Sequence, residues 1–121
     1  MTDTFVFDTF AILEIINGNR NYEKYIDSKI IINDFIFAEL CYKLFRENVP
    51  KAEEYIQKYS KFILELEPRT IKDAMIFRIN NLKKGLSMTD CISYLMANQL
   101  KVRFLTGDKE FKDINNVEFV K

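Results

Sequence analysis

The sequence contains no histidine among its 121 residues. This absence excludes Ser-His-Asp triads, Cys-His pairs, histidine general bases and every zinc site that uses histidine. Any hydrolytic chemistry in this chain would have to rest on carboxylates, on lysine or on a metal ion.

Glycine and proline are also scarce, and the net charge is zero. Three glycines and two prolines indicate few long loops. The 18 Lys and Arg residues balance 18 Asp and Glu residues, so bulk charge does not indicate a nucleic-acid-binding protein. A surface that binds nucleic acid would have to be a local basic patch, offset by acidic residues elsewhere.

The two cysteines, Cys41 and Cys91, lack the spacing of metal ligands. Each lies on an apolar helical stripe, so we expect both to be buried thiols in a reducing compartment. The N-terminal segment has no basic stretch followed by an apolar run, and no apolar run is long enough to span a bilayer. These features predict a cytoplasmic protein without a membrane segment.

Short apolar segments alternate with amphipathic ones along the whole chain, and 48% of the residues are hydrophobic. Strands are expected at residues 5–7, 29–32, 62–66, 103–106 and 117–120, and helices at 9–17, 22–27, 33–48, from Pro50 to 59, 70–84 and 87–100. This alternation predicts a single α/β domain over residues 1–121, with a parallel sheet covered by helices on both faces.

Four acids from distant segments are expected at one edge of this sheet. Asp8 directly follows the first strand, and Asp108 follows the fourth strand by two residues. Asp90 lies in the first turn of the helix that leads into the fourth strand, and that turn returns to the same edge. Glu39 lies roughly one and a half turns into the helix after the second strand. Ligand sites of open α/β sheets form at this edge.

Each acid also has a purely structural explanation. Asp8 and Asp108 could cap the helices that follow them. Asp90 completes a capping box with Ser87, and Glu39 could pair with the lysine four residues later.

The four acids together favour a metal site. Thr70 and Asp73 repeat the spacing of a capping box, and we assign Asp73 to helix capping alone. Clustered carboxylates repel each other unless a cation neutralises them, and oxygen ligands suit Mg²⁺ or Mn²⁺ rather than zinc. Such an ion can activate a water molecule and stabilise charge on a phosphoryl oxygen.

Four segments resemble, in order and spacing, the acidic motifs of PIN-domain ribonucleases: FVFDTFAIL, NDFIFAELCYKL, LSMTDCISYLMA and FLTGDKEF. The resemblance covers nearly the whole chain and implies a three-layer α/β/α fold with a five-stranded parallel sheet of order 3-2-1-4-5. It assigns the catalytic and metal-binding acids to Asp8, Glu39, Asp90 and Asp108, and it adds the Thr106 hydroxyl to the site. The chain departs from the family at Phe10, where many members have Ser or Asn that could support the first acid.

Free-standing family members of this size resemble VapC-type toxins. This resemblance implies a Mg²⁺- or Mn²⁺-dependent endoribonuclease that leaves a 5′-phosphate and a 3′-hydroxyl. It also implies a homodimer inhibited by a small antitoxin, whose tail can place a basic side chain among the acids. We expect the antitoxin groove on the helices of residues 35–60, which carry the aromatic side chains Phe35, Phe37, Tyr42, Phe45, Tyr55 and Tyr59.

Two alternatives remain open at this point. A haloacid-dehalogenase-like phosphatase would use Asp8, Asp108 and Asp113, but Phe10 replaces its second acid and Glu39 would have no role. The other alternative is a catalytically degenerate binding module. Basic residues near the expected crevice are Arg20, Lys43, Arg46, Lys109 and Lys112, and the aromatic residues that could stack on bases are Tyr22, Tyr25 and Tyr42. For each of these side chains taken singly, an ordinary solvated or half-buried helix face is the simpler interpretation.

Overall fold

Four parallel strands form the centre of the protein in the computed structural model, which describes residues 3–121. They are β1 (Thr4–Phe7), β2 (Lys29–Ile31), β3 (Arg103–Thr106) and β4 (Val117–Phe119). Their order is β2-β1-β3-β4, and every neighbouring pair is parallel. The strand order reverses at β1, so a crevice is expected at the carboxyl ends of β1 and β3.

The predicted strand at residues 62–66 is reduced to a single parallel bridge between Ile32 and Ile63. Two hydrogen bonds hold it, from Ile32 N to Phe62 O at 3.0 Å and from Leu64 N to Ile32 O at 2.8 Å. The expected order 3-2-1-4-5 is therefore confirmed. The expectation of five full strands is wrong, because residues 62–66 form only this bridge. Leu64 is 44% exposed at this edge of the sheet, and the ladder ends at this bridge.

The helices follow the predicted order with two changes. Their bounds are α1 (Thr9–Ile16), η1 (Arg20–Tyr25), α2 (Asp34–Arg46), α3 (Ala52–Ser60), α4 (Pro68–Asn80), η2 (Leu82–Lys84), α5 (Met88–Leu100) and η3 (Lys109–Phe111). The predicted helix 70–84 begins earlier, because Pro68 occupies its first turn, and it divides into α4 and η2. Pro50 lies in the turn before α3 rather than in the helix.

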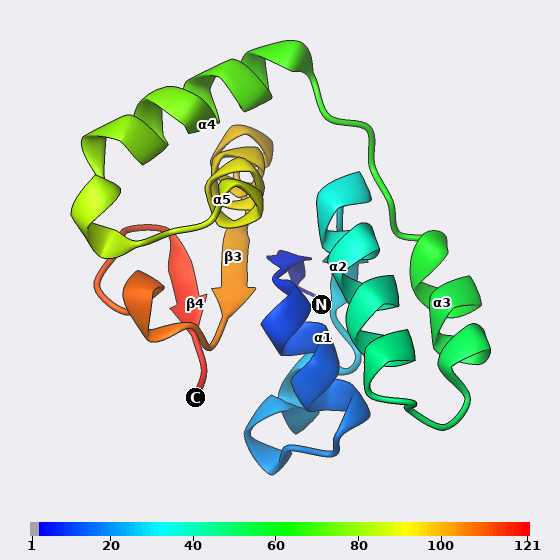
Figure 1. Cartoon of the computed structure of the whole chain (residues 1–121). Helices are drawn as coiled ribbons and strands as arrows, with labels where there is room; N and C mark the ends of the chain where they lie inside the picture. Colours follow the sequence, from blue (N-terminus) through cyan, green and yellow to red (C-terminus); the bar gives the residue numbers. More distant parts are fainter. Residues whose placement is uncertain (1–2) are drawn as a thin grey trace.

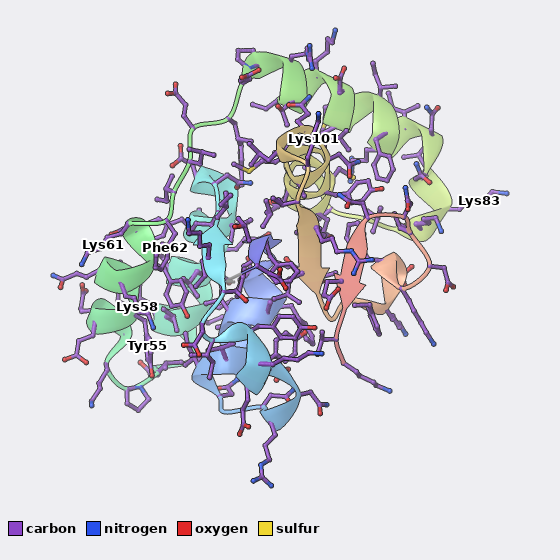
Figure 2. All side chains as sticks on the ribbon, turned by 180° about the vertical axis from the view of Figure 1, so that it is seen from behind. Tyr55, Lys58, Lys61, Phe62, Lys83 and Lys101 are labelled. Carbon is purple, nitrogen blue, oxygen red and sulfur yellow. The ribbon has the colours of Figure 1, made fainter. Side chains whose placement is uncertain are left out.

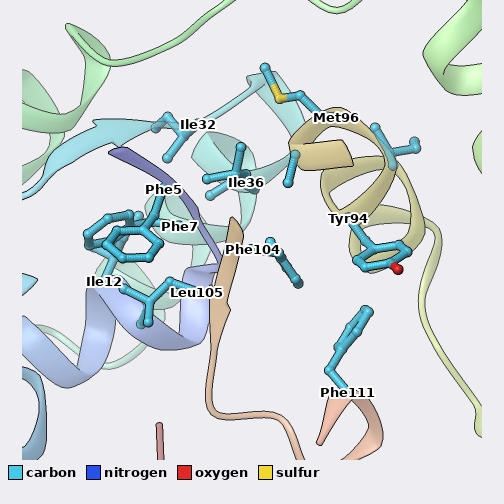
Figure 3. Packing of buried hydrophobic residues seen from close by; sticks show 14 of the residues in the cluster. Phe5, Phe7, Ile12, Ile32, Ile36, Tyr94, Met96, Phe104, Leu105 and Phe111 are labelled. Atoms are coloured by element: carbon cyan, nitrogen blue, oxygen red, sulfur yellow. The ribbon is translucent and has the colours of Figure 1, made fainter. Parts of the chain in front are cut away.

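The core fills both faces of the sheet. Phe5, Val6 and Phe7 are all buried, as expected for a central parallel strand. Figure 3 shows Leu105 near Ile12 of α1, whereas the neighbouring Phe104 points toward α5. Successive strand residues face opposite sides, so α1 and α5 cover opposite faces and the predicted three layers are present.

The cap of α2 links the two helices that lead to the site. Asn33 is fully buried, and its Oδ1 accepts a hydrogen bond from Ile36 N at 3.0 Å. Its Nδ2 donates to Ser93 Oγ of α5 at 3.1 Å. In Figure 1, α5 lies over β3, α4 passes over α5, and α2 lies beside α3. The start of α2 is thus tied to the helix that carries Asp90.

Some apolar side chains of the segment predicted as helix 70–84 are exposed. On α4 and η2, Ile79 is 67% and Leu82 is 66% exposed. Cys91 is a buried free thiol as expected, but Cys41 is only partly buried. No helix within residues 3–121 has the length and apolar character needed to cross a membrane. Figure 2 shows Lys58 and Lys61 at the α3 end of the molecule and Lys83 projecting outward from η2.

Candidate functional site: an acidic pocket at the carboxyl edge of the sheet

One cavity of about 650 Å³ opens at the carboxyl ends of β1 and β3. This volume is in the range of ligand pockets. All four predicted acids line it, and so do four lysines and two phenylalanines. Its lining residues are Asp8, Thr9, Phe10, Glu39, Lys43, Ser87, Asp90, Gly107, Asp108, Lys109, Lys112, Phe119 and Lys121.

Asp8 is the most buried of the four acids, with 5% of its surface exposed. It occupies the N-cap position of α1 but makes no side-chain capping hydrogen bond. Its Oδ2 instead accepts a hydrogen bond from Thr106 Oγ1 at 2.6 Å. Burial, followed by the negative charge of Asp90, raises the pKa of Asp8 to about 7, although the Thr106 bond opposes this. The capping explanation of Asp8 is therefore wrong, and its carboxylate is held inside the pocket.

Glu39 is held by α1 rather than by its own helix. Its Oε1 accepts a hydrogen bond from Thr9 Oγ1 at 2.9 Å. The alternative pair with Lys43 is absent from the ion pairs of residues 3–121. Thr9, which follows Asp8 in the chain, thus fixes Glu39, and the spacing of the sequence did not predict this contact.

Asp90 combines the capping explanation with a place in the pocket. Its Oδ2 accepts a hydrogen bond from Ser87 N at 3.1 Å, and Ser87 Oγ accepts one from Asp90 N at 3.0 Å. Burial raises the pKa of Asp90, the bonds to Ser87 lower it, and the charges of Asp108 and Glu39 raise it. The predicted capping box is confirmed, and it also fixes the orientation of the carboxylate.

Asp108 and Thr106 form the last part of the site. Asp108 caps η3, with Oδ1 accepting a hydrogen bond from Glu110 N at 3.0 Å, and its own N donates to Thr106 Oγ1 at 3.1 Å. Thr106 is fully buried behind the pocket wall. Its hydroxyl joins Asp8 to the backbone of Asp108, and Thr106 itself is not among the residues that line the pocket.

The donor set fits a hard divalent cation in its chemistry. The hydrogen bonds above engage one oxygen of each carboxylate: Oδ2 of Asp8, Oε1 of Glu39, Oδ2 of Asp90 and Oδ1 of Asp108. Among the described residues no three acids converge closely enough to form a ready ligand cluster. Mg²⁺ suits such an open arrangement, because it keeps several waters and takes only one or two carboxylates together with substrate phosphates.

The structure separates the predicted basic residues into two groups. Lys43, Lys109 and Lys112 line the pocket. Arg20 instead lies beside Glu23 on the surface, and Arg46 pairs with Glu47 at 3.2 Å. Lys121 also lines the pocket, which the sequence did not indicate because it lies beyond the last strand.

The predicted base-stacking aromatics are not in the pocket. Tyr22 and Tyr25 are buried in the core, and Tyr42 lies beneath the Arg46 guanidinium outside the pocket. The aromatic side chains that line the pocket are Phe10 and Phe119.

The structure contradicts the capping role of Asp73 and the phosphatase alternative. Thr70 lies inside α4 and its hydroxyl bonds to Gln99, so Asp73 is not part of a capping box. Asp73 lies near Lys72 on the surface instead, at 4.0 Å. Asp113 is exposed, whereas Glu39 and Asp90 line the pocket, so the acids are not grouped as a phosphatase would need.

Three of the solved structures that match the chain show the extent of the similarity in fold. The first is a toxin–antitoxin complex from Klebsiella pneumoniae, with TM-score 0.76, 17% identity, and coverage of 94% of this chain and 95% of the other. A protein from Pyrobaculum aerophilum has TM-score 0.71 and 18% identity, covering 98% and 92%. The third, the sarcin–ricin-loop-cleaving toxin VapC20 of Mycobacterium tuberculosis, has TM-score 0.79 and 14% identity, covering 98% and 100%.

Sequence comparison gives the family directly. No curated protein sequence matches the chain. The family model of the PIN domain matches residues 5–117, a span that includes all four acids of the pocket. With the strand order, the acidic edge of the sheet and this match in agreement, the chain belongs to the PIN-domain family.

Proposed function

We propose that this protein is an Mg²⁺- or Mn²⁺-dependent endoribonuclease and the toxin of a toxin–antitoxin pair. The observation that carries the proposal is the gathering of Asp8, Glu39, Asp90 and Asp108 in one pocket at the carboxyl edge of the sheet. Of the related folds, one is from a toxin–antitoxin complex and another is a toxin that cleaves the sarcin–ricin loop of RNA. These relatives support RNA as the substrate class.

The acids and lysines of the pocket have separate roles in this proposal. The four carboxylates would hold the ion, directly or through its water molecules, while Thr106 and Ser87 keep Asp8 and Asp90 in place. The bound ion would activate a water molecule and stabilise the charge that develops on the phosphoryl oxygen.

The lysines would hold the RNA backbone. Lys43, Lys109, Lys112 and Lys121 line the pocket, and none of them belongs to an ion pair within residues 3–121. Their ammonium groups can therefore bind phosphates, which fixes the strand but selects no sequence. The neutral overall charge is compatible with this local patch.

RNA cleavage tests the nuclease proposal. End-labelled RNA incubated with the protein should be cut with Mg²⁺ or Mn²⁺, and EDTA should stop the reaction. The products should carry a 5′-phosphate and a 3′-hydroxyl, and Asp8→Asn, Asp90→Asn and Asp108→Asn should each abolish cleavage. Asp73→Asn is the matched control, because Asp73 lies on the surface of α4 beside Lys72.

The alternatives give different results in the same assay. A phosphatase would hydrolyse a phosphomonoester and leave RNA intact. A degenerate binding module would bind RNA without cutting it under any divalent metal. Wild-type cleavage by Asp8→Asn or Asp90→Asn would reject the assignment of the site.

The antitoxin half of the proposal rests on an exposed aromatic patch of α2. This patch consists of Phe35, Tyr42 and Phe45, which are 42%, 61% and 53% exposed. Tyr59, also expected in the groove, is buried and inaccessible to a partner. Co-expression with a short upstream reading frame should yield a complex that Phe45→Lys weakens. If the product of that reading frame bound neither the wild type nor Phe45→Lys, the antitoxin half of the proposal would be rejected.

A further inference from the structure

Phe10 is an aromatic residue in a place where metal chemistry needs none. It lies two residues after Asp8 on the first turn of α1, it lines the acidic pocket, and it is 36% exposed. Phe119 lines the same pocket from the end of β4, where it pairs in register with Thr106. The pocket therefore offers two apolar rings among its charged groups.

Gly107 provides the space for the Phe10 ring. A Cβ atom at Gly107 would lie 2.2 Å from Cε1 and 2.8 Å from Cδ1 of Phe10, and 2.5 Å from Val120 O. Gly107 does not have a positive φ, so its backbone conformation does not require glycine. The Phe10 ring and the Val120 carbonyl oxygen require it, because they leave no space for a Cβ atom. One side of the ring is thus held against the turn after β3, beside Asp108.

The charges around the ring define what can lie on it. Lys43, Lys109, Lys112 and Lys121 line the same cavity and attract phosphate, whereas the acids repel it unless a cation is present. A ligand that suits both the lysines and the ring carries a phosphate and a flat apolar group close to each other. A nucleotide has this combination, because every base offers a flat face for stacking.

We propose that Phe10, held on Gly107, is a stacking platform for a base of single-stranded RNA next to the phosphodiester at the acids. This inference rests on the proposed ribonuclease function and names a subsite of it. Bases inside a duplex are already stacked on each other, so only an unpaired nucleotide can use the ring. Phe119 forms a second apolar wall of the same subsite.

Fluorescence gives a direct test, because the chain has no tryptophan. Phe10→Trp places a single indole in the pocket, and Phe45→Trp places one on the exposed side of α2 as a matched control. With Ca²⁺ present to neutralise the acids, and before any cleavage appears on a gel, unstructured RNA should quench the Phe10→Trp emission and leave Phe45→Trp unchanged. An oligonucleotide of the same length with an abasic backbone should bind through its phosphates without quenching. Equal emission of Phe10→Trp with and without RNA overturns the proposal.

A second variant keeps the test decisive if the larger indole disturbs the turn. Phe10→Leu should weaken the binding of RNA, measured under the same Ca²⁺ conditions, by about tenfold and leave the binding of the abasic strand unchanged. Phe45→Leu should change neither affinity. If Phe10→Leu weakens both strands equally, the ring only supports the turn and the proposal fails.

These results separate the subsite from the nuclease activity. Wild-type cleavage of RNA without quenching in Phe10→Trp would reject the subsite and leave the nuclease proposal in place. Quenching by RNA without cleavage under any divalent metal would support the subsite and reject the nuclease.

Discussion

At the scale of single residues, the protonation of Asp8 links the pocket to stability. Its pKa is raised to about 7 in the folded protein, mainly by burial, from 3.8 in an exposed chain. The folded state therefore binds an extra proton between these two values. The contribution of this proton to the free energy of unfolding is fully present below about pH 4 and is lost as the pH rises through 7. A tenfold change in an acid dissociation constant corresponds to about 1.4 kcal/mol, so the loss of stability should be on the order of a few kcal/mol.

Urea unfolding in EDTA measures this effect. The wild-type midpoint should be lower at pH 8 than at pH 5, and Asp8→Asn should reduce the difference. Mn²⁺ should reverse the trend, because the ion binds the deprotonated carboxylate and stabilises the folded state more as the pH rises. A wild-type midpoint that is higher at pH 8 than at pH 5 without metal would contradict the raised pKa.

Thr106 should control the same protonation from behind the pocket wall. Its hydroxyl donates to Asp8 Oδ2 and lowers the pKa that burial raises. Thr106→Val keeps the shape but removes this donor, so Mn²⁺ binding should shift to higher pH, and Thr106→Ser should restore the wild-type profile. A purely structural role would lower stability without moving the pH profile, and that outcome would reject the positioning role.

The sequence predicted the acids of the site better than their neighbours. Asp8, Asp90 and Asp108 lie next to strand or helix ends, and these ends meet at one edge in any parallel sheet. The bond from Thr9 to Glu39 joins α1 to α2, and the packing of Phe10 on Gly107 joins α1 to the turn after β3. Such contacts between distant segments leave no periodic pattern, so the sequence alone could not predict them.

At the scale of elements, the start of α5 fixes Asp90. The capping box between Ser87 and Asp90 satisfies backbone N–H groups that a helix end leaves free. Ser87→Ala should therefore lower the free energy of unfolding by about 1 kcal/mol. It should also weaken Mn²⁺ binding, because Asp90 N loses its bond to Ser87 Oγ and the bond from Ser87 N to the Asp90 carboxylate is left to hold this turn alone.

A thermal melt and a Mn²⁺ titration of Ser87→Ala check this prediction. Ser60→Ala is a control, because Ser60 ends α3 and its hydroxyl bonds only to Gln57 O on the exposed surface. Unchanged stability and metal affinity in Ser87→Ala would show that the capping box has no influence on the site.

The ends of helices and strands, and their buried faces, could be predicted from the sequence only where a whole segment is buried or carries a clear cap. The fully buried β1 and the capped start of α2 were predicted correctly from apolar runs and from Asn33. In the segment 62–66, Phe62, Ile63 and Leu66 pack against the core, but Leu64 is exposed and the segment forms only one bridge. On α4, Thr70 and Ala74 are buried whereas Ile79 is 67% exposed, a difference that apolar character alone does not predict.

At the scale of the whole molecule, we predict a homodimer from the exposed apolar surface. Ile76, Ile79 and Leu82 are 53%, 67% and 66% exposed on α4 and η2, away from the aromatic patch assigned to the antitoxin. Exposed apolar groups of this kind are commonly buried between identical chains. Light scattering at micromolar concentration should give the mass of a dimer, and Ile79→Lys should give a monomer. Phe45→Lys is the control and should remain dimeric, whereas a monomeric wild type would contradict the prediction.

The central claim is that the four-acid pocket binds a divalent metal ion, and calorimetric titration of Mn²⁺ tests it most directly. The wild-type protein and Asp73→Asn should bind the ion alike at pH 7.5. Asp8→Asn and Asp90→Asn should lose most of the binding heat, while a melt shows that both variants remain folded. Absence of binding to the wild type, or equal binding by Asp8→Asn, would contradict the metal site and the nuclease mechanism built on it.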